Sequence, residues 1–282
     1  MPGQTFTLDG YELYFEAVGR PENPPLLMVH GFTLSANMWH TTIDGLEQHM
    51  YCIALDLLGH GRSPVDRDGD HSIEAQGRRV LALADRLGLD RFSVIGHSMG
   101  GQIALCIAAK LAPDRIVKLV DVAGVVSGKV TTTMQQTVIE PLQRMRGNPL
   151  LPAMATFFRF AVRFKSVARK QFATWWYDFD ARDFDWWRED RVLATRPGIH
   201  HTWYPAMEAF LNTDMTPHLS NIQCPSLVIF GEEDRVVPVN EGSMVVQHVP
   251  DCQLELIPDC GHLPMYECTD RYLALLKTFL LY

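Results

Sequence analysis

A serine flanked by glycines at a junction between two apolar segments constrains this chain more than any other feature. The serine is Ser98, in Gly96-His97-Ser98-Met99-Gly100. Residues 92–95 before it are apolar and β-rich, and residues 101–110 after it predict a buried helix. Such a sharp strand-to-helix turn strains the backbone and crowds its neighbours, so a Cβ at either glycine would clash. The turn would project the Ser98 hydroxyl from a sheet towards free N–H groups at a helix N-terminus.

A hydroxyl at neutral pH needs a base to take its proton, and the base needs a carboxylate to orient it. His262 follows the strand-like run 253–257 and is the candidate base. Asp234 follows the apolar strand-like run 226–230 and is the candidate acid. The sequence therefore predicts a Ser98-Asp234-His262 triad.

A reacting carbonyl also needs two N–H donors for the oxyanion that forms on it. Met99, directly after the serine, would supply one donor, and Phe32, directly after the strand-like run 26–29 and His30-Gly31, would supply the other. His30 and His97 adjoin these parts, and we expect them to shape the turns through local hydrogen bonds.

These motifs together resemble the α/β-hydrolase family over nearly the whole chain. The likeness rests on residues 96–100, His30-Gly31, Asp56-Leu57-Leu58-Gly59-His60-Gly61-Arg62-Ser63, residues 231–238 and Gly261-His262. It implies an α/β fold with a mostly parallel, doubly wound sheet and the chain order Ser, Asp, His. Some family members take the acid from the preceding strand, so Asp121 is the alternative to Asp234. Asp56 and Arg62 are expected to stabilise the loop beside the oxyanion hole, and Glu232 and Glu233 to be solvated loop charges.

The pattern of apolar residues predicts one core interrupted by an insertion. Residues 5–8 and 11–17 predict an antiparallel edge, and strands alternate with helices from residue 25 to about 124. Two further helices are predicted, at 73–87 with Ser72 as its cap and at 270–281. We assign residues 1–128 and 216–282 to the core. The resemblance implies that residues 129–215 form a helical cap, or lid, inserted after the sixth strand.

The cap segment is unusually aromatic, with five of the six tryptophans and eight of the fourteen phenylalanines. Apolar residues at helical spacing predict an amphipathic helix over Phe157–Trp175. These aromatics would pack the cap onto the core, or line an apolar acyl or aromatic pocket, or face an interface. For the pocket, we single out Phe160, Phe164, Trp175 and Trp176 beside Phe32 and His97.

Positive charge is concentrated in the same part of the chain. Residues 129–172 contain eight Lys and Arg and a single acid, Glu140, whereas the whole chain carries a net charge of −8. Such a segment could lie on anionic lipid, dock an acidic acyl carrier protein, or be a solvated face balanced by the acidic run 178–190.

Composition limits the other possibilities. The acidic balance argues against nucleic-acid binding. No run of about 18 uncharged apolar residues predicts a transmembrane segment. The first residues lack a basic and an apolar region of a secretory signal. The six scattered cysteines form no metal-binding pattern and suggest reduced thiols. We therefore expect a cytoplasmic protein without a metal or cofactor.

Acyl transfer is the chemistry that these residues favour. The leading hypothesis is hydrolysis of a carboxylic ester carrying an apolar acyl or aromatic group, with lactones and thioesters, including carrier-bound thioesters, as close relatives. Hydrolysis of a C–C bond in ring-cleavage products is a second enzyme hypothesis. It is weakened because such enzymes usually have a longer glycine-rich oxyanion loop and commonly Asn at the position of His97. A ligand receptor on a hydrolase scaffold is the non-enzyme alternative.

Overall fold

The computed structural model describes residues 3–161, 164, 166–167, 175–177 and 184–282. Its centre is a single eight-stranded sheet in the order β1-β2-β4-β3-β5-β6-β7-β8. The two N-terminal strands pair antiparallel, and the remaining strands run parallel to one another. The strands are β1 (Gln4–Leu8), β2 (Tyr11–Val18), β3 (Pro25–Val29), β4 (Tyr51–Leu55), β5 (Phe92–His97), β6 (Ile116–Val122), β7 (Ser226–Gly231) and β8 (Cys252–Ile257).

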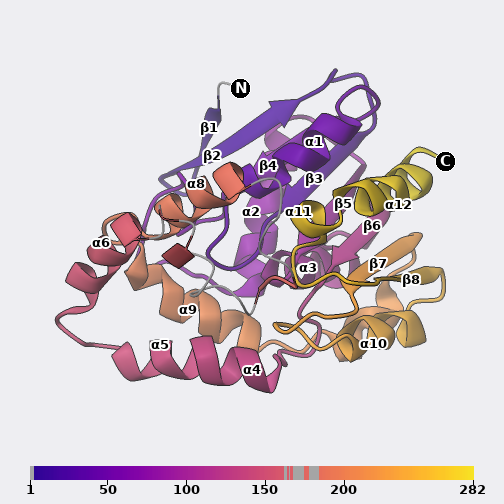
Figure 1. The fold of residues 1–282 in the computed structure, drawn as a ribbon. Coiled ribbons are helices and arrows are strands. Elements are labelled where there is room, and N and C mark those ends of the chain that lie inside the picture. The colour runs from indigo at the N-terminus through magenta and orange to yellow at the C-terminus, as the bar shows by residue number, and fades with distance from the viewer. Residues whose placement is uncertain (1–2, 162–163, 165, 168–174, 178–183) are drawn as a thin grey trace.

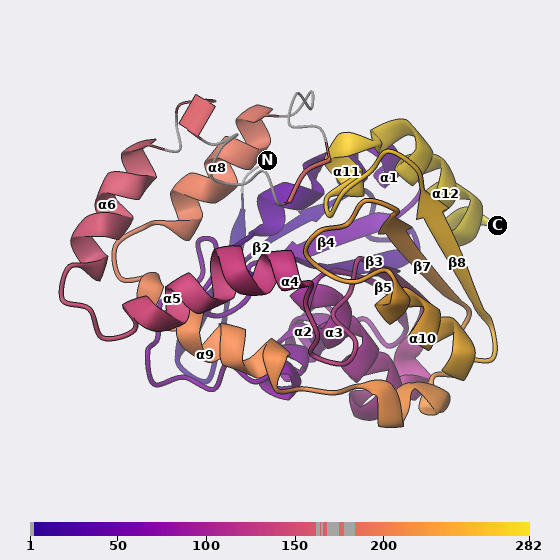
Figure 2. The ribbon, with the colours of Figure 1, turned by 60° about the horizontal axis from the view of Figure 1, so that its bottom comes forward.

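Helices cover both faces of this sheet, which is why its central strands are buried along their whole length. One face is covered by α1 (His40–Leu46) and α12 (Thr269–Leu281), and the other by α2 (Ile73–Arg86), α3 (Met99–Cys106) and α10 (Asn240–His248) (Figure 2). The doubly wound α/β architecture expected from the sequence is confirmed.

A local sequence signal explains where α2 begins. The Ser72 hydroxyl accepts a hydrogen bond from the Ala75 N–H and caps α2, as predicted. The α3 helix begins at Met99 and continues as a π-helical turn over Ile107–Leu111.

The chain between β6 and β7 leaves the sheet and lies over its carboxyl edge (Figure 1). In the described residues its α-helices are α4 (Thr132–Met134), α5 (Glu140–Met145), α6 (Leu151–Ala161), α8 (Phe184–Ala194) and α9 (His200–Leu211), with a π-helical segment over Gln135–Ile139 and a 3₁₀ segment over Thr216–Asn221. The predicted boundaries of the amphipathic helix were wrong, because α6 begins six residues before Phe157 and ends before Phe164, which lies in a bend. Much of the remainder of the predicted Phe157–Trp175 helix lies outside the described residues. No helix of the described chain is long and apolar enough to cross a bilayer.

Candidate active site

Ser98 occupies a strained backbone position between β5 and α3. Its φ is +55° and its ψ is −118°, a conformation that L-residues rarely adopt. A Cβ on Gly96 would lie 2.0 Å from the Gly100 carbonyl oxygen, and one on Gly100 would lie 2.1 Å from the Val29 carbonyl oxygen. The predicted need for both glycines is therefore confirmed. The surrounding backbone holds the serine at the point where β5 ends.

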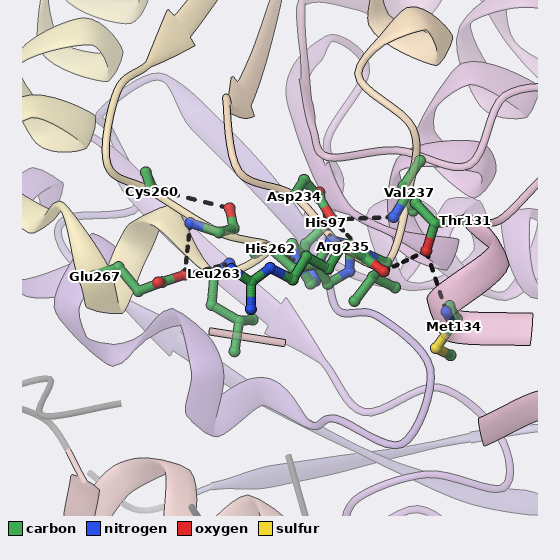
Figure 3. Close-up of polar contacts among 12 residues, drawn as sticks. His97, Thr131, Met134, Asp234, Arg235, Val237, Cys260, His262, Leu263 and Glu267 are labelled. Atoms are coloured by element: carbon green, nitrogen blue, oxygen red, sulfur yellow. Dashed lines mark hydrogen bonds and ion pairs between the residues drawn. The ribbon is translucent and has the colours of Figure 1, made fainter. Parts of the chain in front are cut away.

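His262 and Asp234 meet at the ends of two neighbouring strands. The Nδ1 of His262, on the loop after β8, lies 2.8 Å from Oδ2 of Asp234, on the loop after β7, and both side chains are buried. The other Asp234 oxygen accepts hydrogen bonds from the N–H groups of Val236 (2.8 Å) and Val237 (3.0 Å) (Figure 3). Asp234 is thus fixed by backbone on one side and can orient the imidazole on the other.

Two buried histidines shape the adjoining turns, as the sequence analysis expected. The ring of His30 donates from Nδ1 to the Gly31 carbonyl (2.8 Å) and accepts the Leu57 N–H at Nε2 (3.0 Å). His97 donates from Nε2 to the carbonyl of His262 (2.9 Å) and so ties the candidate base to the serine loop. Burial lowers the pKa of His30 to about 4 and that of His97 well below its usual value, so both are neutral near pH 7.

The N–H groups of Phe32 and Met99 are the candidate oxyanion donors. Within the described residues, neither N–H has a hydrogen-bond acceptor. The two segments are close, because a Cβ on Gly31 would lie 3.2 Å from the Cβ of Ser98. Buried backbone N–H groups are rarely left unpaired, and a pair beside a serine is what an oxyanion requires.

Asp56 fixes the loop segments beside these donors. Its carboxylate accepts the N–H groups of Ala36 and Arg62, each at 2.6 Å, and is fully buried. Arg62 also donates to Oδ1 of Asn37 at 3.0 Å. These contacts agree with the stabilising role expected for Asp56 and Arg62.

Ser98 and His262 line one narrow apolar pocket between the sheet and the predicted cap. The space in which the centre of a water molecule can move there is about 10 Å³, roughly what a single water needs. Four of the lining residues come from the predicted cap segment. The lining residues are Phe32, Leu34, His97, Ser98, Val125, Val130, Met134, Trp175, Phe210, Val236 and His262.

The comparisons with known proteins identify the family and the fold of the chain. The family model described as alpha/beta hydrolase fold matches residues 24–268. The chain belongs to the alpha/beta hydrolase fold family. The hydrolase is 26% identical over 275 residues to the pimeloyl-[acyl-carrier protein] methyl ester esterase of Nitrosomonas europaea, covering 93% of this chain and 97% of the relative.

Two further similarities bear on activity and on fold. The hydrolase is 26% identical over 264 residues to the 2-hydroxy-6-oxononadienedioate/2-hydroxy-6-oxononatrienedioate hydrolase 1 of Dechloromonas aromatica, covering 90% of this chain and 86% of the relative. The solved structure of an esterase from Exiguobacterium antarcticum superposes with a TM-score of 0.80 at 19% identity and covers all of both chains. At that identity, the superposition shows the shared fold alone.

The aromatic residues predicted to line the pocket divide into two groups. Trp175 lies on the pocket wall, with its ring edge-on to His262. Trp176 is buried against Tyr266 instead, and Phe160 and Phe164 are exposed and contact each other. The prediction for these three residues is corrected, since helical spacing identifies an apolar face but not the element that covers it.

Asp121 lies apart from the His262–Asp234 pair. It is buried below the N-terminal turn of α3, and neither of its oxygens has a hydrogen-bond partner among the described residues. Two glycines make room for it: a Cβ on Gly101 would lie 2.1 Å, and one on Gly124 2.0 Å, from its Oδ1. Burial, and secondly the charge of Glu241, raise the pKa of Asp121 to about 8.

Replacing Asp121 with asparagine should remove a pH dependence of stability. The folded state keeps a proton that the unfolded state loses above about pH 4, so unfolding releases a proton until the pH reaches about 8. The contribution of Asp121 to the free energy of unfolding therefore falls as the pH rises from about 4 to about 8. We expect the Tm of Asp121→Asn, relative to wild type, to increase steadily from pH 5 to pH 8. The control is Asp114→Asn, which changes an exposed aspartate. If the Tm relative to wild type changed with pH equally in both variants, the prediction would be contradicted.

Glu267 is a positioning residue that the sequence analysis missed. One of its oxygens accepts the N–H groups of Gly261 (3.1 Å) and Leu263 (3.2 Å), which flank His262 (Figure 3). The other accepts the N–H of Tyr177 at 2.6 Å. One carboxylate thereby holds the candidate base on both sides and joins it to the segment that carries Trp175.

A buried pair of neighbouring residues on α8, Asp190 and Arg191, was also missed from the sequence and holds the loop of the candidate donor Phe32. Arg191 donates to the carbonyl (2.7 Å) and the hydroxyl (3.1 Å) of Thr33, directly after Phe32, and its guanidinium lies over the ring of Trp175. The neighbouring Asp190 accepts a hydrogen bond from Ser35. Burial lowers the pKa of Arg191 to about 10 and raises that of Asp190 to about 7. Thr33 has a φ of +58°, a strained conformation that these contacts help to hold.

Replacing Arg191 with methionine should therefore impair catalysis, because Thr33 loses the contacts that hold the loop of the candidate donor Phe32. We expect kcat to fall by about tenfold to a hundredfold, less than the about 10²–10³ for losing a donor outright, with little change in KM. The Tm should also fall, because Asp190 loses its neighbouring positive charge.

The double variant Asp190→Asn/Arg191→Met separates the two effects, measured by steady-state kinetics and thermal unfolding. It should regain part of the Tm while kcat stays low. An unchanged kcat in a folded Arg191→Met protein would rule out the positioning role.

Proposed function

We propose that the protein is a serine hydrolase that cleaves a carboxylic ester with an apolar acyl group. The contact that carries this proposal is the 2.8 Å hydrogen bond between buried His262 and Asp234, because His262 lines the same pocket as Ser98. A strained serine, an oriented imidazole and two free N–H groups together suit acyl transfer.

In the proposed mechanism, Ser98 attacks the ester carbonyl while Nε2 of His262 takes the hydroxyl proton. The Ser98–His262 hydrogen bond would form with substrate bound, as catalytic contacts commonly tighten in the complex. The N–H groups of Phe32 and Met99 stabilise the oxyanion, and His262 returns the proton to the leaving alcohol. A water molecule deprotonated by His262 then hydrolyses the acyl-enzyme and frees Ser98.

Two further enzyme candidates follow from the relatives. One relative is named for a carrier-bound methyl ester, which favours an acyl group on a carrier as an alternative substrate. The other is named for a 2-hydroxy-6-oxo dienedioate, which keeps C–C bond hydrolysis as the second candidate function. The mainly apolar pocket lining favours the ester, because within the described lining residues no cation is present to pair with substrate carboxylates.

The deciding experiment is hydrolysis of p-nitrophenyl esters from acetate to dodecanoate, beside a 2-hydroxy-6-oxo dienedioate. Ester turnover with an optimum in chain length supports the proposal and measures the acyl pocket. Turnover of the dienedioate alone would replace it with C–C hydrolysis. A kcat far below about 1 s⁻¹ on every substrate, with tight binding of a ligand, would instead indicate that the protein is a ligand receptor built on a hydrolase scaffold.

A further inference from the structure

Five exposed apolar side chains form a row that lies along α6 and the bend after it. Within α6, a spacing of three or four residues places these side chains along one side of the helix. The opposite side packs inwards, where Leu151 and Ala155 are buried. The exposed fractions are 64% for Leu150, 46% for Met154, 74% for Phe157, 58% for Phe160 and 54% for Phe164.

The position of α6 leaves this row open to a large partner. Figures 1 and 2 both show α6 at the outer edge of the molecule, away from the sheet. The Phe160 and Phe164 rings pack edge to face with centroids 5.6 Å apart, so part of the row is preorganised. Single exposed apolar residues need no explanation, but a contiguous group of five large ones indicates an interaction surface.

Positive charge and projecting apolar side chains together favour an anionic lipid surface as the partner. Residues 129–172, which contain the row, carry a net charge of +7, and the rest of the chain therefore carries −15. Because these basic residues belong to the same stretch of chain as the row, we expect an anionic surface to attract that stretch more than the rest of the protein. Projecting Phe, Leu and Met side chains on a basic background suit insertion at the headgroup boundary of a bilayer.

We propose that the α6 row, defined as Leu150, Met154, Phe157, Phe160 and Phe164, docks the protein on the surface of an anionic lipid bilayer. Docking uses the apolar row for insertion and the positive charge of residues 129–172 for attraction. It does not depend on the proposed ester chemistry, because neither Met154 nor Phe157 lines the pocket.

The test is co-sedimentation with vesicles of phosphatidylcholine containing about one-fifth phosphatidylglycerol. We expect wild type to bind, and Met154→Gln/Phe157→Gln to lose at least about tenfold in partition coefficient, because two inserting side chains are removed. The matched control is Val117→Thr/Leu256→Thr, which removes two exposed apolar side chains from the sheet and should bind like wild type. Binding should weaken on pure phosphatidylcholine and at high salt. Circular dichroism checks that all variants are folded.

Three outcomes would overturn lipid docking. Equal binding by wild type and the Met154/Phe157 variant would remove the α6 row from the interaction. Absence of vesicle binding, with a wild-type dimer that the variant converts to monomer, would assign the row to a second copy of the chain. Absence of vesicle binding, with row-dependent binding of purified acyl carrier protein, would assign it to that acidic partner.

Discussion

Replacing Ser98 with alanine is expected to abolish ester hydrolysis, with kcat falling by about 10⁵–10⁶-fold. The change removes the proposed nucleophile, and the other candidate parts cannot form an acyl-enzyme without it. The fold should be unaffected, because within the described contacts the hydroxyl makes no hydrogen bond and the backbone strain at Ser98 is present in both proteins. Turnover of p-nitrophenyl butyrate and the Tm, measured on the same preparation, check both statements.

The exposed Ser220→Ala provides the control for this substitution. It should keep wild-type turnover. Near wild-type turnover by Ser98→Ala would refute the proposed nucleophile, whereas loss of both activity and folded structure would call for a second variant such as Ser98→Cys.

Replacing Asp234 with asparagine should lower kcat by about 10⁴-fold, as a wrong histidine tautomer does in serine proteases. The side-chain carbonyl of the asparagine would keep the two hydrogen bonds that the N–H groups of Val236 and Val237 now donate to Oδ1 of Asp234. Its amide group would then face Nδ1 of His262 and force that nitrogen to accept. The imidazole proton would move to Nε2, the atom that must take the Ser98 proton.

The matched control is Asp121→Asn, because Asp121 is the other acid that the family could use. In the described part of the chain Asp121 has no hydrogen-bond partner, and His262 bonds to Asp234 instead, so this variant should keep nearly full activity. Steady-state kinetics on both proteins decide between them. An inactive Asp121→Asn beside an active Asp234→Asn would move the orienting role to Asp121.

The fold and the candidate triad were predictable because their signals are local. Ser98 needs a glycine two residues before it and another two residues after it. Asp234 and His262 each follow an apolar strand that a short window of sequence reveals. Parallel strands bring such strand ends to one edge of the sheet, so residues 136 positions apart in the chain can be grouped without coordinates.

The supporting residues were not predictable, because their partners lie far away in the sequence. Arg191 donates a hydrogen bond to Thr33, 158 positions away in the sequence, and Glu267 accepts one from Tyr177, 90 positions away. Neither carries a local pattern that distinguishes it from other charged residues on helices. Phe160 shows the opposite error: its helical spacing marked an apolar face, but whether protein or solvent covers a face depends on how helices pack.

The narrowness of the pocket has a consequence for binding energetics. A space of about 10 Å³ beside Ser98 and His262 cannot hold an acyl chain. We therefore expect binding of an acyl chain to displace side chains that line the pocket, so that only the fraction of molecules in the wider conformation is competent. The apparent Kd is the intrinsic Kd divided by that fraction. Substitutions that enlarge the open population would raise kcat/KM without touching a catalytic group.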